Sequence, residues 1–240
     1  MSTGRDEDAP ECDLGELDAI TRSIEELDAI RRRVINVVGH ALRTPVTTIA
    51  GMANALGATD DEATRAMLVD GLARNSQRVE LLLDDLLLAA GVSTALPAGD
   101  AASSSVCDTF AASWSALGGP GDLSVLGPDL SVLARCGAFE RIAHVVLDNA
   151  LKYGHGPIRV SNETTSSGVR IEVESVGDAL SDDELEHAFE LFYRGEHAVM
   201  TAPGLGIGLA VARQLARAEG GEVGLVRRND AIVATVELPA

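Results

Sequence analysis

Residues 39–45 read Gly-His-Ala-Leu-Arg-Thr-Pro and place a histidine inside a long helical pattern. The apolar residues that lead up to it recur every three or four positions: Leu17, Ile20, Ile24, Leu27, Ile30, Val34 and Val37. This spacing predicts a helix with one buried face. His40 falls between those positions, so its imidazole is expected to point to water, with Thr44 beside it on the same helix face. A neutral imidazole on a rigid helix can act as a nucleophile near pH 7.

A second helical pattern follows a polar turn at residues 57–62, where Thr59 or Asp60 is expected to cap the next helix. Its seam alternates in steps of four and three: Leu68, Leu72, Asn75, Val79, Leu82, Leu86 and Ala89. Two such helices form a hairpin, and Pro45 should bend the first of them. Because one hairpin leaves apolar surface uncovered, two chains are expected to pair as a four-helix bundle. The alternative is that this seam packs on the C-terminal domain of the same chain.

The rest of the chain mixes helices and strands after a linker rich in Gly, Ser, Ala and Pro at residues 93–104. Helices are expected near 106–117, over 138–153, from 182 and over 206–218. Strands are expected near 123–126, 131–135, 158–160, 169–173, 222–227 and 231–238. Such mixing is typical of an α/β layer architecture.

Composition excludes several classes of function. The formal net charge is −18, whereas nucleic-acid binding needs a basic surface. Anionic lipid surfaces are disfavoured for the same reason, and no apolar run approaches the roughly 20 residues of a membrane-spanning helix. The acidic residues 1–15 are expected to be a disordered tail rather than a secretory signal. Cys12, Cys107 and Cys136 are far apart and odd in number, which fits a reducing cytoplasm better than a disulfide framework.

Four ordered segments resemble the motifs of two-component sensor histidine kinases. Residues 39–45 resemble the phosphoacceptor motif, usually His-Glu/Asp-Leu-Arg-Thr-Pro. Residues 148–153, Asp-Asn-Ala-Leu-Lys-Tyr, resemble the asparagine motif. Residues 189–194, Phe-Glu-Leu-Phe-Tyr-Arg, resemble the phenylalanine motif, and residues 204–209, Gly-Leu-Gly-Ile-Gly-Leu, resemble the second glycine motif. The resemblance runs from about Leu17 to the C-terminus, and four motifs in order are far more specific than any one.

The resemblance implies an α+β fold with two parts. A dimeric antiparallel helical hairpin, the dimerisation and phosphoacceptor domain, would span residues 16–92. An α/β sandwich ATP-binding domain of the histidine kinase type would span residues 105–240, with a mixed sheet covered on one face by helices. A flexible lid at residues 195–203 would cover the nucleotide.

The resemblance also implies the chemistry. His40 would attack the γ-phosphate of ATP and pass the phosphoryl group to an aspartate on the receiver domain of a response regulator. Thr44 would position water for dephosphorylating that regulator; otherwise it is an ordinary threonine on a helix face. Arg43 is either a solvated charge or a docking contact.

The resemblance further implies a nucleotide site that would hold ATP and Mg²⁺. Asn149 would be the metal ligand, because an amide oxygen suits a hard cation that also bridges phosphates. Lys152 would balance phosphate charge, and the glycine turn before a helix would offer backbone N–H groups to phosphate. The full set of cofactor-binding residues is Asn149, Lys152, Tyr153, Ser175, Gly177, Arg194, Gly204, Gly206, Gly208 and Leu209.

Three departures from the family pattern bear on activity. Ala41 stands where an acidic residue takes up the imidazole proton, and general acid–base help is worth about 10²–10⁴-fold. Val145 stands where the family usually has another Asn, so the protein is expected to offer Mg²⁺ fewer ligands. Ser175 replaces the Asp that binds the adenine amino group in the first glycine motif, whose second Gly is Ala179. A charged hydrogen bond of that kind is worth roughly 1.5–3 kcal/mol.

We interpret the sequence as the core of a cytoplasmic, dimeric histidine kinase that also has phosphatase activity. The alternative is a degenerate phosphotransfer or scaffold protein of the same ancestry with weak or no ATP use. A serine kinase that controls a sigma factor shares the nucleotide fold but would not need the His40 helix. No sensor domain is visible, so either a separate sensory partner delivers the signal or the sequence is a fragment.

Overall fold

The structure is a computed structural model of the 240-residue chain. It describes residues 36, 38–39, 41–89, 99–121, 123–177, 180–195 and 205–240. The chain divides into two compact units, residues 1–44 and 45–240, and nearly all described residues belong to the second. The predicted acidic tail at residues 1–15 and His40 lie outside the described residues.

The predicted helical hairpin is present. Residues 41–58 are helical, and α2 (Glu62–Ala89) follows after a short turn. The two helices touch closely, because a Cβ on Gly71 would lie only 2.8 Å from the sulfur of Met52. No helix in the described part of the chain is both long and apolar enough to cross a membrane.

The cap of α2 differs from the expectation of Thr59 or Asp60. Asp61 caps the helix, and its Oδ2 accepts a hydrogen bond of 2.8 Å from the backbone N–H of Thr64. Thr59 instead braces the turn, since its hydroxyl oxygen accepts from the Asp61 N–H at 3.3 Å. Asp61 takes the capping role because it is the residue directly before the first helical turn.

The mixed sheet expected for the C-terminal domain is confirmed. Its strand order is β2-β4-β5-β7-β6, with β2 and β4 parallel and the other neighbours antiparallel. Its strands are β2 (Val125–Leu126), β4 (Gly154–Thr165), β5 (Gly168–Gly177), β6 (Glu222–Arg228) and β7 (Ala231–Leu238). Burial alternates along β5, where Val169, Ile171 and Val173 are buried. The period of two therefore places one face of the sheet against a core.

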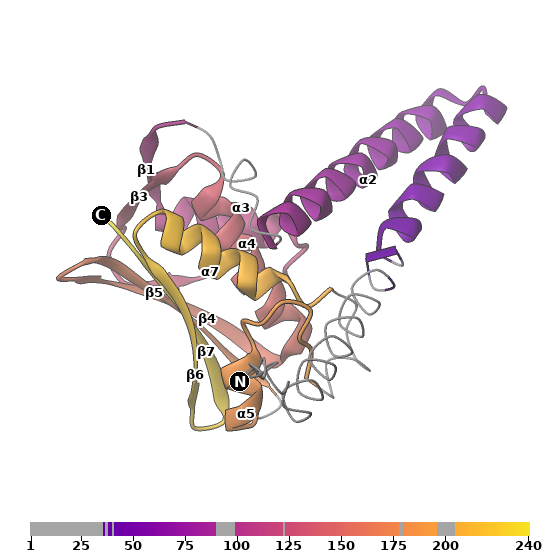
Figure 1. The fold of residues 1–240 in the computed structure, drawn as a ribbon. Coiled ribbons are helices and arrows are strands. Elements are labelled where there is room, and N and C mark those ends of the chain that lie inside the picture. The colour runs from indigo at the N-terminus through magenta and orange to yellow at the C-terminus, as the bar shows by residue number, and fades with distance from the viewer. Residues whose placement is uncertain are drawn as a thin grey trace, which may run out of the picture. The chain divides into compact units, whose positions relative to one another are not determined.

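Helices cover that face. They are α3 (Val106–Ala116), α4 (Ala138–Tyr153) and α7 (Gly208–Ala218), which gather on one side of the sheet (Figure 1). Their largest buried side chains are Phe110, Phe139, Ile142, Leu147 and Leu215. A short helix, α5 (Asp182–His187), follows β5 in the chain.

The segment predicted as a linker contains regular structure. Its last residues belong to β1 (Ala101–Ser105), which pairs antiparallel with β3 (Ser131–Arg135) in a separate two-stranded sheet. The sequence of β1 is Ala-Ala-Ser-Ser-Ser, which lacks the branched and aromatic residues that signal a strand. Its pairing with β3, rather than its own propensity, makes it a strand.

The C-terminal end of α2 packs on the same domain. Leu88 is buried in the core cluster shared with α3, α4 and the sheet. Arg141 of α4 forms an ion pair with Asp85 and donates a hydrogen bond of 2.9 Å to the Leu81 carbonyl oxygen. These contacts come from Leu81, Asp85 and Leu88 rather than from the predicted seam residues, so the alternative that the seam itself packs on this domain stays a prediction.

Burial raises the pKa of Asp85 above its ordinary value, and the nearby charge of Arg141 only partly opposes that shift. The folded chain thus holds the Asp85 proton more tightly than the unfolded chain. The contribution of Asp85 to stability is then fully present at low pH and is lost as pH rises through the raised pKa.

We therefore predict a pH-dependent effect of Asp85→Asn, which removes this titration. The unfolding free energy of the wild type, relative to the variant, should be higher at pH 4 than at pH 7, as measured by urea unfolding. Asp70→Asn is the matched control, since Asp70 pairs with Arg74 on the exposed surface of the same helix, and its effect should be small at both pH values. A difference for Asp85→Asn that does not change with pH would contradict this account.

Candidate active site

The C-terminal half of α4 carries the asparagine motif. Val145, Asn149 and Lys152 follow at steps of four and three, so they share one helix face. Asn149 is half-buried, and Val145 is only 9% exposed. The Lys152 ammonium donates to the Asp148 carboxylate at 2.5 Å, one turn earlier on the helix. Sequence reasoning missed this partner, although the i, i+4 spacing of opposite charges signals it.

The end of β5 meets the end of α4. Gly177 pairs with Gly154, and a Cβ on Gly177 would lie 2.5 Å from the Tyr153 carbonyl oxygen. Ser175 is 8% exposed, and its Cβ is 3.1 Å from the ideal Cβ position of Gly154. The asparagine motif and the first glycine motif are therefore in direct contact. Asp178 and Ala179 lie outside the described residues.

The second glycine motif leads into α7. Gly206 has a φ of +69°, a conformation that favours glycine, and Gly208 is the first residue of the helix. Ile207 at the N-cap makes no side-chain capping hydrogen bond to the N–H groups of the first turn. Leu209 lies half-buried in that turn, whereas Gly204 and most of the predicted lid lie outside the described residues.

The phenylalanine motif lies against this glycine turn. The Phe192 N–H donates a hydrogen bond of 2.8 Å to the Gly206 carbonyl oxygen. A Cβ on Gly206 would clash with the Tyr193 carbonyl oxygen and lie 2.9 Å from Cγ of Arg194. Phe189 is partly buried and packs against the core. The geometry thus brings Arg194 to the glycine turn.

The glycine turn also reaches α4. A Cβ on Gly208 would lie 3.3 Å from Cγ1 of Val145. Val145, which stands where the family usually has a second Asn, therefore faces the glycine motif but offers it only methyl groups. Through these contacts α4, the end of β5, the phenylalanine motif and the start of α7 meet in one region.

The donor set of this region fits magnesium held mainly by a nucleotide. Among the described residues, no cluster of three or more His, Cys, Asp or Glu could hold a metal ion. Mg²⁺ commonly takes one or two protein ligands and completes its shell with phosphate oxygens and waters. The half-buried Asn149 amide meets that requirement, whereas Val145 adds no ligand.

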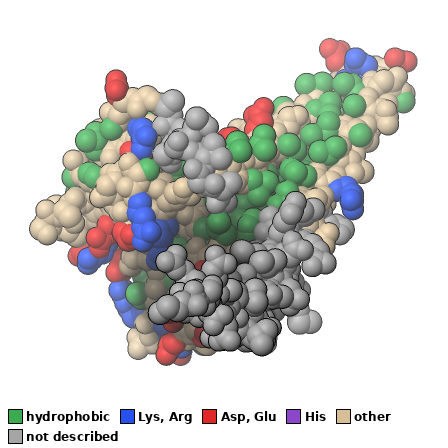
Figure 2. Space-filling model, in the orientation of Figure 1, with side chains coloured by type: hydrophobic (Ala, Val, Ile, Leu, Met, Phe, Trp, Pro, Cys, Tyr) green, Lys and Arg blue, Asp and Glu red, His purple; other side chains and the backbone are tan. Residues whose placement is uncertain are grey.

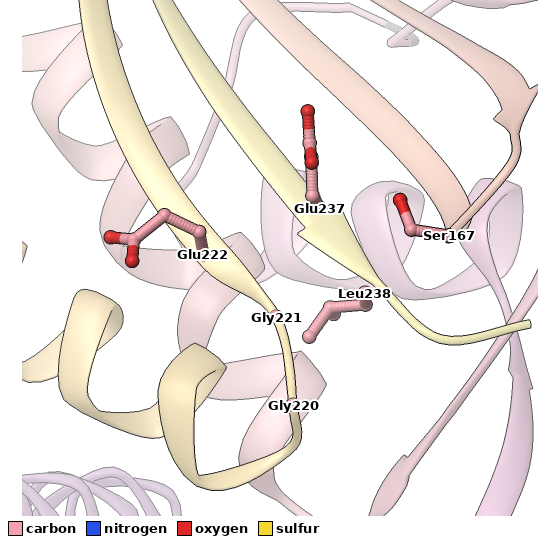
Figure 3. A pocket seen from close by; sticks show the side chains of 6 residues that line it. All are labelled: Ser167, Gly220, Gly221, Glu222, Glu237 and Leu238. Atoms are coloured by element: carbon pink, nitrogen blue, oxygen red, sulfur yellow. The ribbon is translucent and has the colours of Figure 1, made fainter.

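Two small pockets of the described structure are lined by other residues. One of about 200 Å³ is lined by Ser167, Gly220, Gly221, Glu222, Glu237 and Leu238 (Figure 3). Another of about 190 Å³ is lined by Glu174, Val176, Arg228, Asn229, Asp230 and Ala231. Neither contains a predicted site residue, and the two carboxylates of the first would repel phosphate.

Of the phosphoacceptor motif, the residues that follow His40 lie within the described part of the chain. Ala41, Arg43 and Thr44 lie in the first helix of the hairpin, where Arg43 and Thr44 are exposed and Pro45 is buried. Helical structure continues on both sides of Pro45. The residue after the histidine has no carboxylate to offer, as the sequence already indicated.

Two glycines of the second motif should respond in opposite ways to alanine. We predict that Gly206→Ala lowers the free energy of unfolding by about 1–3 kcal/mol, because its φ is left-handed and the added methyl meets the Tyr193 carbonyl. Gly208→Ala should be neutral or stabilising by up to about 1 kcal/mol, since alanine favours the helix and Val145 needs to yield only slightly. Urea unfolding checks both, and equal losses would contradict the geometry.

Comparisons with known proteins agree with this arrangement. Residues 30–91 match the His Kinase A (phospho-acceptor) domain. Residues 137–240 match the histidine kinase-, DNA gyrase B- and HSP90-like ATPase family. The bacteriophytochrome of Pseudomonas aeruginosa is 28% identical over 228 residues, which cover 89% of this chain and 30% of the relative. The sensor histidine kinase MtrB of Mycobacterium tuberculosis is 28% identical over 218 residues, 83% of this chain and 37% of the relative.

Solved structures share the fold. Full-length ShkA in complex with AMPPNP matches with a TM-score of 0.57 and 22% identity, over 87% of this chain and 45% of that one. The histidine kinase AdeS of Acinetobacter baumannii matches with a TM-score of 0.51 and 19% identity, over 83% of this chain and 97% of that one. This chain spans about a third of the length of its curated relatives bacteriophytochrome and MtrB. By its two domains, its ordered motifs and these relatives, the chain belongs to the two-component sensor histidine kinases.

Proposed function

We propose that this chain transfers the γ-phosphoryl group of Mg-ATP to His40 and then to an aspartate on the receiver domain of a response regulator. In the first step an imidazole nitrogen of His40 bonds to the γ-phosphorus while the bond to the β–γ bridging oxygen breaks and ADP leaves. The observation that supports ATP use most strongly is the contact of the glycine turn with both α4 and the phenylalanine motif.

Each part of this region has a role toward the nucleotide. The Asn149 amide oxygen would hold Mg²⁺, which neutralises phosphate charge when bound. Lys152 would donate to a phosphate oxygen while it keeps its bond to Asp148, since an ammonium group has three donors. The N–H groups that open α7 and the Arg194 guanidinium would bind the remaining phosphate oxygens. The adenine end of the nucleotide site would be lined by Tyr153, Ser175 and Gly177.

The departures from the family pattern weaken the forward reaction in this proposal. Without a carboxylate at Ala41, the proton of the attacking imidazole must leave to water. The hydroxyl of Ser175 binds an adenine amino group without the help of a charge. We therefore propose slow autophosphorylation and weak affinity for ATP.

Thr44 supports a second activity on the same helix. It is exposed one turn after His40 in the sequence, where its hydroxyl could orient a water toward a phosphorylated regulator. This reaction needs neither the carboxylate missing at Ala41 nor adenine binding by Ser175. Phosphatase activity would thus survive better than autokinase activity.

The hairpin supports a homodimer. Large apolar side chains are exposed along α2, among them Met67 at 64%, Val69 at 53% and Leu83 at 51%. Figure 2 shows hydrophobic side chains spread over the hairpin. A surface of this kind on paired helices is expected to be covered by the same surface of a second chain. We place this dimer in the cytoplasm, where Cys107 and Cys136 would stay reduced and a separate sensory partner could act on it.

The rival function is a phosphotransfer or scaffold protein that has lost ATP use. Its supporting observation is that Ala41, Val145 and Ser175 all lack the polar groups of the family pattern. Labelling of the chain by ATP that carries a labelled γ-phosphate separates the two functions.

We predict that the purified chain, given ATP labelled in the γ-phosphate, acquires an acid-labile, alkali-stable label slowly. His40→Gln should abolish the label. Ala41→Glu combined with Ser175→Asp should raise the labelling rate about tenfold or more, from the sizes of the general-base and charged hydrogen-bond effects.

Two controls decide between the functions. Label that persists in His40→Gln would refute the assignment of the phosphoacceptor. A chain that stays unlabelled even with both substitutions, yet takes a phosphoryl group from a phosphorylated regulator, would establish the scaffold function instead.

A further inference from the structure

Arg213 lies in α7 in an unusual position for a charged side chain. Its guanidinium carbon is 3.3 Å from the centre of the Phe189 ring. Its Nε donates a hydrogen bond of 3.0 Å to the Val223 carbonyl oxygen and lies 2.9 Å from the Glu222 carboxylate. Contacts with two segments, the phenylalanine motif and β6, thus fix this guanidinium, whose side chain is only 29% exposed.

Phe189 is the first residue of the phenylalanine motif, which contacts the glycine turn. Three residues later, Phe192 has a φ of +65° and donates its N–H to the Gly206 carbonyl oxygen. A bulky side chain rarely adopts this left-handed conformation, which persists only where the surroundings impose it. The Tyr193 carbonyl and Arg194 complete the contact with Gly206.

Two of the contacts that hold the segment from Phe189 to Arg194 join it to α7 and the turn before that helix. One is the hydrogen bond of Phe192 to the glycine turn, and the other is the stack of Phe189 on Arg213. A cation over an aromatic face is attracted by the ring quadrupole, and partial burial strengthens that attraction. Because Arg213 is itself held by β6, the stack fixes Phe189 relative to α7, the helix that opens at the glycine turn.

We infer that Arg213 is a positioning residue for nucleotide binding. It holds Phe189 and, through that ring, keeps Phe192 and Arg194 against the Gly206 turn where phosphate would bind. This inference rests on the proposed function, because it takes that turn to be a phosphate site. Arg213 does not touch the nucleotide in this account, so its effect falls on the affinity of the site.

The neighbouring turn of α7 offers a matched control. Arg217 pairs with the same carboxylate as Arg213, its Nε lying 2.8 Å from Glu222, and it is 61% exposed. Phe189 stacks on Arg213, the residue one turn earlier. A comparison of Arg213→Met with Arg217→Met therefore separates loss of the stack from loss of an ion pair with Glu222.

Hydrogen exchange at the Phe192 amide, measured by NMR on the unliganded chain, directly reports the strength of its hydrogen bond to the Gly206 carbonyl oxygen. Arg213→Met should speed that exchange at least about fivefold, Arg213→Lys should give an intermediate rate, and Arg217→Met should leave it unchanged. In a Phe189→Leu background, Arg213→Met should add little further change, because the stack is already lost.

The affinity of the chain for a fluorescent ATP analogue with Mg²⁺ tests whether this contact supports nucleotide binding. Arg213→Met should raise its Kd about 3- to 10-fold, in line with the strength of a partly buried cation–π contact. Autophosphorylation should show the same rise in KM with a smaller change in kcat, a split that general loss of stability would not produce.

Equal effects of Arg213→Met and Arg217→Met, or no change of Phe192 exchange in either, would overturn the inference. Faster exchange with unchanged Kd would overturn it as well, because the stack would then be structural only. If the unmodified chain binds no nucleotide at all, the proposed function fails and Arg213 has no positioning role, even where exchange at Phe192 responds.

Discussion

The packing of α4 on the sheet is the constraint on which the site depends. The helix buries Phe139, Ile142 and Leu147 in the core, and Val145 and Asn149 lie along the flank of that buried face in its C-terminal half. There the end of β5 reaches the Tyr153 carbonyl, and α7 starts beside Val145. Gly177 stands at the first approach, where a Cβ would meet the Tyr153 carbonyl oxygen. The hydrophobic core and the candidate site thus adjoin each other on one helix.

Much of this architecture could be predicted because its signals are local. The helix at 138–153 was predicted with both ends correct, since apolar residues repeat at helical spacing and Gly154 ends the run. The alternation of β5 predicted a strand with one buried face. The family, the fold class and the hairpin are confirmed. The domain boundaries and the roles of the site residues stay predictions, and His40 and Gly204 lie outside the described residues.

Other features depend on contacts between distant residues and leave no local signal. The strand β1 exists through its pairing with β3, in which the paired residues are 26 or more positions apart in the chain, and its own sequence of small residues resembles a linker. The stack of Phe189 on Arg213 joins residues on either side of the glycine motif. The approach of Val145 to Gly208 is likewise a product of tertiary packing. It shows that the departure at Val145 lies beside the second glycine motif rather than at a neutral surface.

The central claim is that this region binds Mg-ATP despite its departures from the family pattern. Calorimetric titration of the whole chain with ATP, with and without Mg²⁺, tests it most directly. We expect saturable but weak binding that depends on Mg²⁺ and is lost or strongly reduced in Lys152→Ala, with the fold intact by circular dichroism. Absence of binding at millimolar ATP, or equal binding by Lys152→Ala, would contradict the account.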